Sequence, residues 1–205
     1  MRKQGPMLDI QADAAPDRRP TIVICAWDTD ETGWDPVEDL SGVAWNPAGA
    51  RTVPVAGDDP ETLAGTLQAH LEQRGCRALL LVGRTGHGES FRVQMRAENR
   101  VLNGSRRLDD TGPGVARATA PVAEIVEALT VAGLMAAASS ESEPDAGSYL
   151  LYRILSGLPD GIDSPAIALL RAPAAASDAA VQRAVKTAAE AIARHLAPLP
   201  RYHSP

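Results

Sequence analysis

Two cysteines and four histidines are the side chains of this sequence best suited to nucleophilic catalysis. A cysteine nucleophile acts as a thiolate and needs an imidazole nearby. Cys25 lies within a predicted buried strand, and Cys76 lies at the amino end of another, so both favour an inert, buried thiol. His87 alone is expected in a loop at the carboxyl end of a strand, unlike the others, His70, His195 and His203. The spacing of these residues fits no zinc site.

A glycine-rich segment, Gly-Arg-Thr-Gly-His-Gly, spans Gly83 to Gly88. It lacks the Gly-Lys-Ser/Thr ending of a P-loop and does not fit Gly-x-Gly-x-x-Gly. We interpret it as a tight strand exit in which glycine permits positive φ. The sequence therefore predicts no nucleotide, no other cofactor and no metal.

Alternating strands and helices must position these residues. Short apolar runs predict inner strands at 22–26, 78–82, 134–139 and 166–170, and a weak alternation predicts one or two exposed strands between Phe91 and Val101. Helices are expected to follow Asp59-Pro60 and Pro121, and to be capped by Asp145 and Asp178. This order predicts one three-layer α/β/α domain with a mainly parallel sheet. Ligands of such folds lie beyond the carboxyl ends of the strands.

Composition limits the possible partners. The chain has 205 residues, with 20 Lys plus Arg against 26 Asp plus Glu, a net charge of −6 and 3% aromatic residues. This argues against nucleic acid, and no apolar run is long enough for a membrane span. The amino terminus lacks the apolar core of a secretory signal, so we expect a cytoplasmic protein. We expect a flexible arm at 1–20, the α/β domain at 21–197 and a tail at 198–205.

Several blocks, taken in order, resemble the pyroglutamyl peptidases (pyrrolidone-carboxylate peptidases), cysteine peptidases that remove an N-terminal pyroglutamate. The segment from Gly112 to Val122 is similar to the family's Gly-Pro-x-Ala-Tyr-x-Ser-Thr-Leu-Pro-Ile, without gaps. The other blocks are Val53-Pro54-Val55, Val82-Gly83-Arg84, Ala146-Gly147-Ser148-Tyr149-Leu150 and Leu170-Arg171-Ala172-Pro173. The resemblance spans about Thr21 to Ala193 and implies a sheet with flanking helices, in agreement with the periodicity.

The family's catalytic triad does not carry over. The resemblance places Leu151 at the position of the nucleophilic Cys, Arg171 at that of the His and Ser90 at that of the Glu, with Glu89 one residue away. Leucine cannot attack a carbonyl, and arginine stays protonated and cannot act as a general base. Arg100 matches the family's arginine that is thought to help polarise the substrate carbonyl. We therefore expect a pyroglutamyl-peptidase-like protein without peptidase activity, acting as a binding or assembly module.

Other interpretations remain open. A hydrolase could use a relocated site, with Ser139, Ser140 or Ser148 beside His87 and Glu89. Alternatively, Arg84, Arg100 and Arg171 could gather around a small anionic ligand, with Trp27 stacking in the cleft. A peptide N-terminus is the other possible partner. The acidic insertion from Ser139 to Pro144 is either a cover over the old pocket or a solvated loop. The resemblance also implies a possible homo-oligomer.

Overall fold

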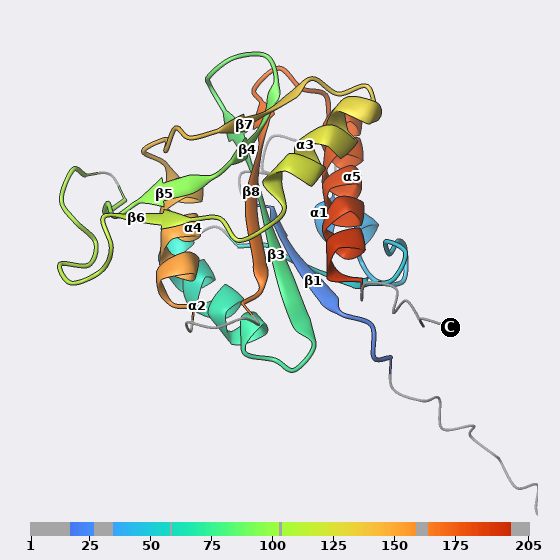
Figure 1. Cartoon of the computed structure of the whole chain (residues 1–205), viewed down its shortest axis with the longest axis horizontal. Coiled ribbons are helices and arrows are strands. Elements are labelled where there is room, and N and C mark those ends of the chain that lie inside the picture. Colours follow the sequence, from blue (N-terminus) through green and yellow to red (C-terminus); the bar gives the residue numbers. More distant parts are fainter. Residues whose placement is uncertain (1–16, 27–34, 58, 103, 159–163, 198–205) are drawn as a thin grey trace, which may run out of the picture.

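A six-stranded sheet forms the centre of the molecule (Figure 1). The computed structural model describes residues 17–26, 35–57, 59–102, 104–158 and 164–197. The strand order is β2-β1-β3-β8-β4-β7, and only the β4–β8 pair is antiparallel. The strands are β1 (Thr21–Ala26), β2 (Arg51–Val55), β3 (Cys76–Thr85), β4 (Phe91–Gln94), β7 (Ala136–Ser139) and β8 (Ala166–Pro173). The predicted α/β class with a mainly parallel sheet is confirmed.

Helices cover both faces of this sheet. One core lies between the sheet and helices α3 (Val122–Val131) and α5 (Asp178–Leu196), and the other between the sheet and helices α2 (Pro60–Leu71) and α4 (Ala146–Ser156). A four-residue helix, α1 (Pro36–Asp39), precedes β2. Strands β1 and β8 are buried along their whole length, because both of their faces are covered. None of the helices in the described ranges is long and apolar enough to cross a membrane.

A small second sheet stands beside the first. It pairs β5 (Arg96–Glu98) with β6 (Val115–Arg117) in antiparallel register, and it packs on α4 (Figure 1). Strand β6 has only three residues and was not predicted from the sequence.

Polar side chains cap the helices at the predicted positions, with one exception. Asp59 and Asp145 accept hydrogen bonds from backbone N–H groups in the first turns of α2 and α4. The prediction that Asp178 caps the last helix is wrong by one residue. Ser177 is the N-cap, since its extended backbone lets Oγ accept from Ala180 N, and Asp178 is the first helical residue.

Two predictions about strand position are wrong. Strand β4 was expected to be exposed, yet it lies inside the sheet between β8 and β7, and its polar Gln94 is buried. Conversely, residues 134–139 were expected to form an inner strand, but β7 is an edge strand with two exposed alanines, Ala137 and Ala138. Strand β4 can be buried because a distant segment of the chain provides hydrogen-bond partners for its polar side chains. The alanine-rich sequence of β7 is apolar enough to suggest an inner strand, but small alanine side chains also suit an edge strand.

Two glycines provide a test of the backbone geometry. Gly133 ends α3 with φ of +77°, and Gly65 lies on the exposed side of α2 with open space at its missing Cβ. We expect Gly133→Ala to lower the free energy of unfolding by about 1 kcal/mol because of left-handed strain. Gly65→Ala should raise it by roughly 0.5–1 kcal/mol through helix propensity. Urea unfolding followed by circular dichroism measures both, and changes of the same sign would contradict this geometry.

Candidate functional site

A buried arginine lies at the carboxyl-end edge of the central sheet. Arg171, in β8, exposes 1% of its surface. Its Nε donates to Gln94 Oε1 at 2.7 Å, and its Nη2 donates to Ser148 Oγ at 2.9 Å. Its Nη1 and Nη2 also bond both carboxylate oxygens of Asp145, at 2.5 and 2.8 Å. The guanidinium therefore makes a bidentate ion pair with Asp145 and further hydrogen bonds with Gln94 and Ser148.

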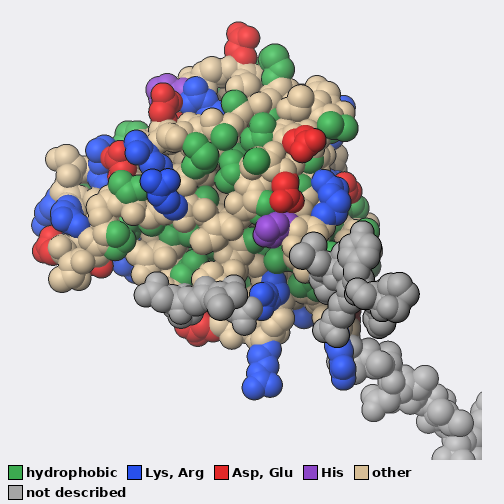
Figure 2. All heavy atoms as spheres, viewed as in Figure 1, with side chains coloured by type: hydrophobic (Ala, Val, Ile, Leu, Met, Phe, Trp, Pro, Cys, Tyr) green, Lys and Arg blue, Asp and Glu red, His purple; other side chains and the backbone are tan. Residues whose placement is uncertain are grey.

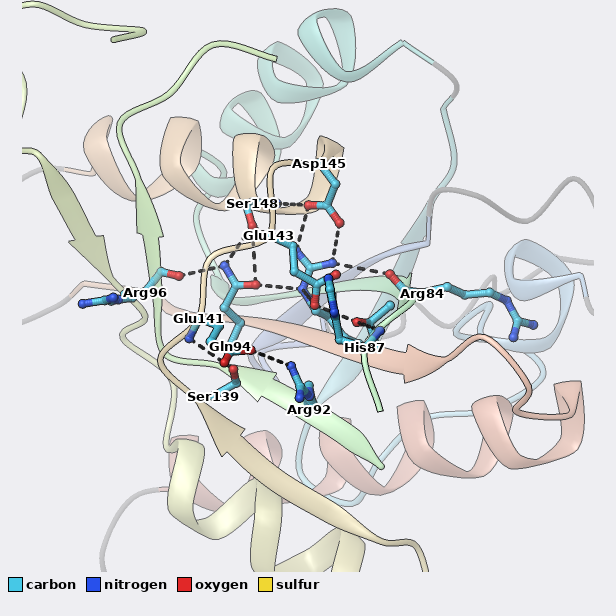
Figure 3. A network of polar contacts seen from close by, with 12 residues as sticks. Arg84, His87, Arg92, Gln94, Arg96, Ser139, Glu141, Glu143, Asp145 and Ser148 are labelled. Carbon is cyan, nitrogen blue, oxygen red and sulfur yellow. Dashed lines mark hydrogen bonds and ion pairs between the residues drawn. The ribbon is translucent and has the colours of Figure 1, made fainter. Parts of the chain in front are cut away.

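This arrangement follows from the cost of burying a charge. An arginine side chain keeps its proton, so burial requires a counter-charge and acceptors for its N–H groups. Asp145 supplies the charge and also caps α4, where its Oδ1 accepts from Ser148 N at 2.9 Å. Figure 3 shows Gln94, Glu143, Asp145 and Ser148 converging from different elements. The network thus ties the first turn of α4 to strands β4 and β8.

The acidic insertion forms a strap, residues 139–144, across this network. Glu141 pairs with Arg92 at 2.9 Å. Glu143, only 12% exposed, accepts from Thr85 Oγ1 at 2.7 Å and lies 3.6 Å from Arg171 Nε. Glu141, Glu143 and Asp145 each lie within ion-pair distance of an arginine of β4 or β8, so their side chains lie on the same side of the strap. The strap is therefore anchored to the protein rather than left in solvent.

The other side of the strap is fixed to the small sheet. Arg96 Nε donates to Ser140 O, and Glu98 N donates to Ser142 Oγ at 3.2 Å. Ser140 and Ser142 of the strap thus bind the small sheet, whereas Glu141 and Glu143 bind the central sheet. Figure 3 shows Glu141 and Glu143 on the strap, with Arg92 and Arg96 on either side of it.

Opposed positive charges explain why this segment is acidic. Arg92 and Arg171 are direct partners in the antiparallel register of β4 and β8, so their side chains leave the same face of the sheet. Like charges directly opposite each other are destabilising. Three carboxylates, of Glu141, Glu143 and Asp145, lie within ion-pair distance of these two guanidinium groups.

In the described part of the chain, the residues that the resemblance assigns to the triad do not converge on a catalytic centre. Leu151, which the resemblance places at the nucleophile position, is fully buried in the core between α4 and the sheet. Ser90 is partly exposed and Glu89 is exposed, and neither bonds to Arg171. Gln94 and Asp145 are the polar partners there instead. We did not predict from the sequence that Gln94 and Asp145 are partners of Arg171. The acidic residues at every second position, Glu141, Glu143 and Asp145, could have indicated a buried positive charge nearby.

The three arginines expected to share an anion are directed to separate acceptors. Arg84 Nη1 donates to the backbone oxygens of the turn after β8, and its Nη2 lies 3.4 Å from Asp178. Arg100 pairs with Glu98 at 3.1 Å on the surface. Figure 3 shows the Arg84 side chain extending away from the network around Asp145. Trp27 lies outside the described residues.

A small pocket lies next to the network. Arg100 and Glu98 line it together with Ser142, Asp145 and Tyr149. Of the residues expected to bind a ligand, Arg100 lines this pocket, whereas Arg171 is the centre of the network itself. Among the described residues, no group of three or more His, Cys, Asp or Glu side chains is arranged to hold a metal ion.

The serines of the alternative hydrolase site bond to partners other than His87. Ser148 Oγ is buried and accepts from Arg171 and Gln94. Ser139 Oγ accepts from Glu141 N at 3.2 Å. His87 is exposed, and within the described part of the chain its imidazole has no hydrogen-bond partner. The arrangement therefore lacks an imidazole held against a hydroxyl.

Both thiols are buried. Cys25 has no exposed surface, and burial raises its pKa to about 12. Burial also raises the pKa of Cys76. Both thiols are therefore protonated at neutral pH, and neither has the character of a nucleophile.

Removing the buried cation should be costly. We expect Arg171→Met to lower the free energy of unfolding by about 3 kcal/mol, because it leaves the carboxylates of Glu143 and Asp145 without their counter-charge. Arg92→Met is the matched control and should cost less than about 1 kcal/mol, since its partner Glu141 is 74% exposed. Chemical denaturation measures both, and equal losses would show that the Arg171 network does not stabilise the fold.

The raised thiol pKa predicts pH-dependent protection. Iodoacetamide should label Cys25 slowly in the native protein even at pH 9, because the thiolate forms only near pH 12. In urea the thiol should ionise near its ordinary pKa of 9.0 and react rapidly. Mass spectrometry of the labelled peptide follows the reaction, and rapid native labelling at neutral pH would contradict a buried Cys25.

Known structures share this fold. No protein-family model and no curated protein matches the sequence. Pyroglutamyl peptidase I of Bacillus amyloliquefaciens superposes with a TM-score of 0.69 at 18% identity, over 86% of this chain and 98% of that one. Pyrrolidone carboxyl peptidase of Thermus thermophilus gives 0.64 at 20% identity, over 82% and 98%, and that of Thermococcus litoralis gives 0.67 at 15%, over 86% and 94%. The chain therefore has the pyroglutamyl peptidase fold that the sequence resemblance implied.

Proposed function

We propose that this chain is a divergent relative of the pyroglutamyl peptidases that has lost peptidase chemistry and acts as a binding or assembly module. The observation that carries the proposal is the side chain at the position of the family's histidine. There Arg171 is buried and held by Asp145, Gln94 and Ser148. A guanidinium in this state cannot take a proton from a nucleophile.

The nucleophile position supports the same proposal. Leu151 packs in the core with Leu150 and Tyr152 on α4, and its side chain is inaccessible to a substrate. A triad that lacks one acting member loses orders of magnitude in rate. Here the positions of both the nucleophile and the base hold residues that cannot serve.

The strap adds a physical obstruction. Its Glu143 side chain occupies the space between Thr85 and Arg171, and Ser142 and Pro144 line the small pocket that remains beside it. A substrate that approached this edge of the sheet would have to displace these contacts. We therefore place binding or assembly on the outer surface of the fold, with a second copy of the chain among the candidate partners that the resemblance implies.

Hydrolysis of a fluorogenic pyroglutamyl amide under reducing conditions tests this proposal. We expect the wild-type chain to release no more fluorophore than a Cys25→Ala, Cys76→Ala double variant, because neither thiol is accessible or ionised. An authentic pyroglutamyl peptidase in the same assay serves as the positive control.

Two results would overturn the proposal. Wild-type turnover that the double variant lacks would identify a cysteine peptidase. Turnover that survives in the double variant but is lost on Ser148→Ala would identify a hydrolase with a serine nucleophile. Circular dichroism of each variant establishes that it is folded before the rates are compared.

A further inference from the structure

The small sheet carries a second pair of opposed arginines. In the antiparallel register of β5 and β6, Arg96 lies directly opposite Arg117, and both are exposed. Figure 2 shows Lys and Arg side chains gathered on the side of the molecule where Figure 1 places these two strands. This local excess of positive charge stands out in a chain whose net charge is −6.

The inner face of the small sheet fixes where these side chains lie. Ala97 and Ala116 are the next pair in the register, and both are buried in the core beside α4. Because side chains alternate across a strand, Arg96 and Arg117 leave the opposite face, towards solvent. Their Cβ atoms are then roughly 5 Å apart, as for any directly opposed pair.

Neither of these two guanidinium groups has a counter-charge in the part of the chain that the structure describes. Within the described residues, Arg96 makes one side-chain hydrogen bond, from Nε to Ser140 O, and Arg117 makes none. Glu98 is the acidic residue of the same strand, and it is paired with Arg100 at 3.1 Å. The η nitrogens of both Arg96 and Arg117 therefore remain available as donors.

The opposed pair of Arg92 and Arg171 has carboxylate partners that the pair of Arg96 and Arg117 lacks among the described residues. Arg92 and Arg171 also face each other across a register, and three carboxylates of the chain neutralise them. For Arg96 and Arg117 the chain provides no carboxylate within ion-pair distance among its described residues. Like charges so placed repel, and an external anion between them would remove the repulsion.

We propose that Arg96 and Arg117 form a binding site for an oxyanion with at least two oxygen atoms, either a phosphate monoester or a carboxylate. Each planar guanidinium donates paired N–H bonds, and such forks match the oxygens of phosphate and carboxylate groups. One oxyanion lying between the two side chains would accept from both. Arg96 and Arg117 belong to the small sheet and not to the hydrogen-bond network of Arg171, so the site does not depend on the proposed loss of peptidase chemistry.

Thermal unfolding at low salt tests the site, with phenyl phosphate and glutarate as probes. We expect one of the two probes to raise the unfolding temperature of the wild-type chain in a saturable way, because a ligand that binds the folded state stabilises it. Arg96→Gln and Arg117→Gln should each weaken binding at least tenfold by isothermal titration calorimetry. Without a probe, Arg117→Gln should unfold at the same temperature as the wild type or higher, since the repulsion is gone and no side-chain hydrogen bond is lost among the described residues.

Arg106→Gln is the matched control, because Arg106 is an exposed arginine in the segment between β5 and β6 and lies outside the paired residues of the two strands. It should keep the full response to the probe. Sodium chloride at equal ionic strength should not reproduce the shift. A response to phenyl phosphate alone assigns a phosphate site, and a response to glutarate alone assigns a carboxylate site. The proposal is overturned if neither probe binds, or if all three variants respond like the wild type.

Discussion

Burial of one positive charge constrains much of this structure. Arg171 sits within the central sheet, where a guanidinium keeps its proton and must find both a counter-charge and hydrogen-bond acceptors. Asp145 provides the charge, while Gln94 and Ser148 provide further acceptors. Strand β8, strand β4 and the first turn of α4 are thereby held in one arrangement.

The strap is the second consequence of the same charge. Arg92 opposes Arg171, so the pair needs more negative charge than Asp145 alone supplies. The insertion brings Glu141 and Glu143 to the same side, and Thr85 holds Glu143 in place. The chain thus has the pyroglutamyl peptidase fold, and at this edge of the sheet the carboxylates of Glu141, Glu143 and Asp145 lie against Arg92 and Arg171.

The sequence predicted those features that depend on local pattern. The apolar runs of β1, β3 and β8 and the caps Asp59 and Asp145 follow from residue type and spacing alone. Strand β4 was misjudged because its polar face is buried only after the strap, nearly fifty positions later in the chain, covers it. The edge position of β7 likewise depends on tertiary packing, since its alanines suit either an inner or an edge strand.

The site was predictable in part. The resemblance places Leu151 and Arg171 at positions of the family's triad, but the sequence did not indicate the partners of Arg171, because Gln94 and Asp145 lie 77 and 26 residues from it in the chain. Arg84 and Arg171, which we expected to share an anion, donate to separate acceptors within the chain. Both lie at the same edge of the sheet, yet Arg84 turns towards the start of α5. Sheet topology places residues at an edge, and only side-chain packing decides which of them meet.

A charged, immobilised Arg171 holds β4, β8 and the first turn of α4 together, and arginine side-chain NMR tests its state directly. In ¹H–¹⁵N spectra at neutral pH, we predict a resolved Arg171 Nε–H signal that exchanges slowly with water, since Nε is buried and donates to Gln94. Arg171→Lys assigns the signal by its loss. A rapidly exchanging, averaged Arg171 signal like that of the exposed Arg106 would contradict the central claim that this charge is locked within the protein.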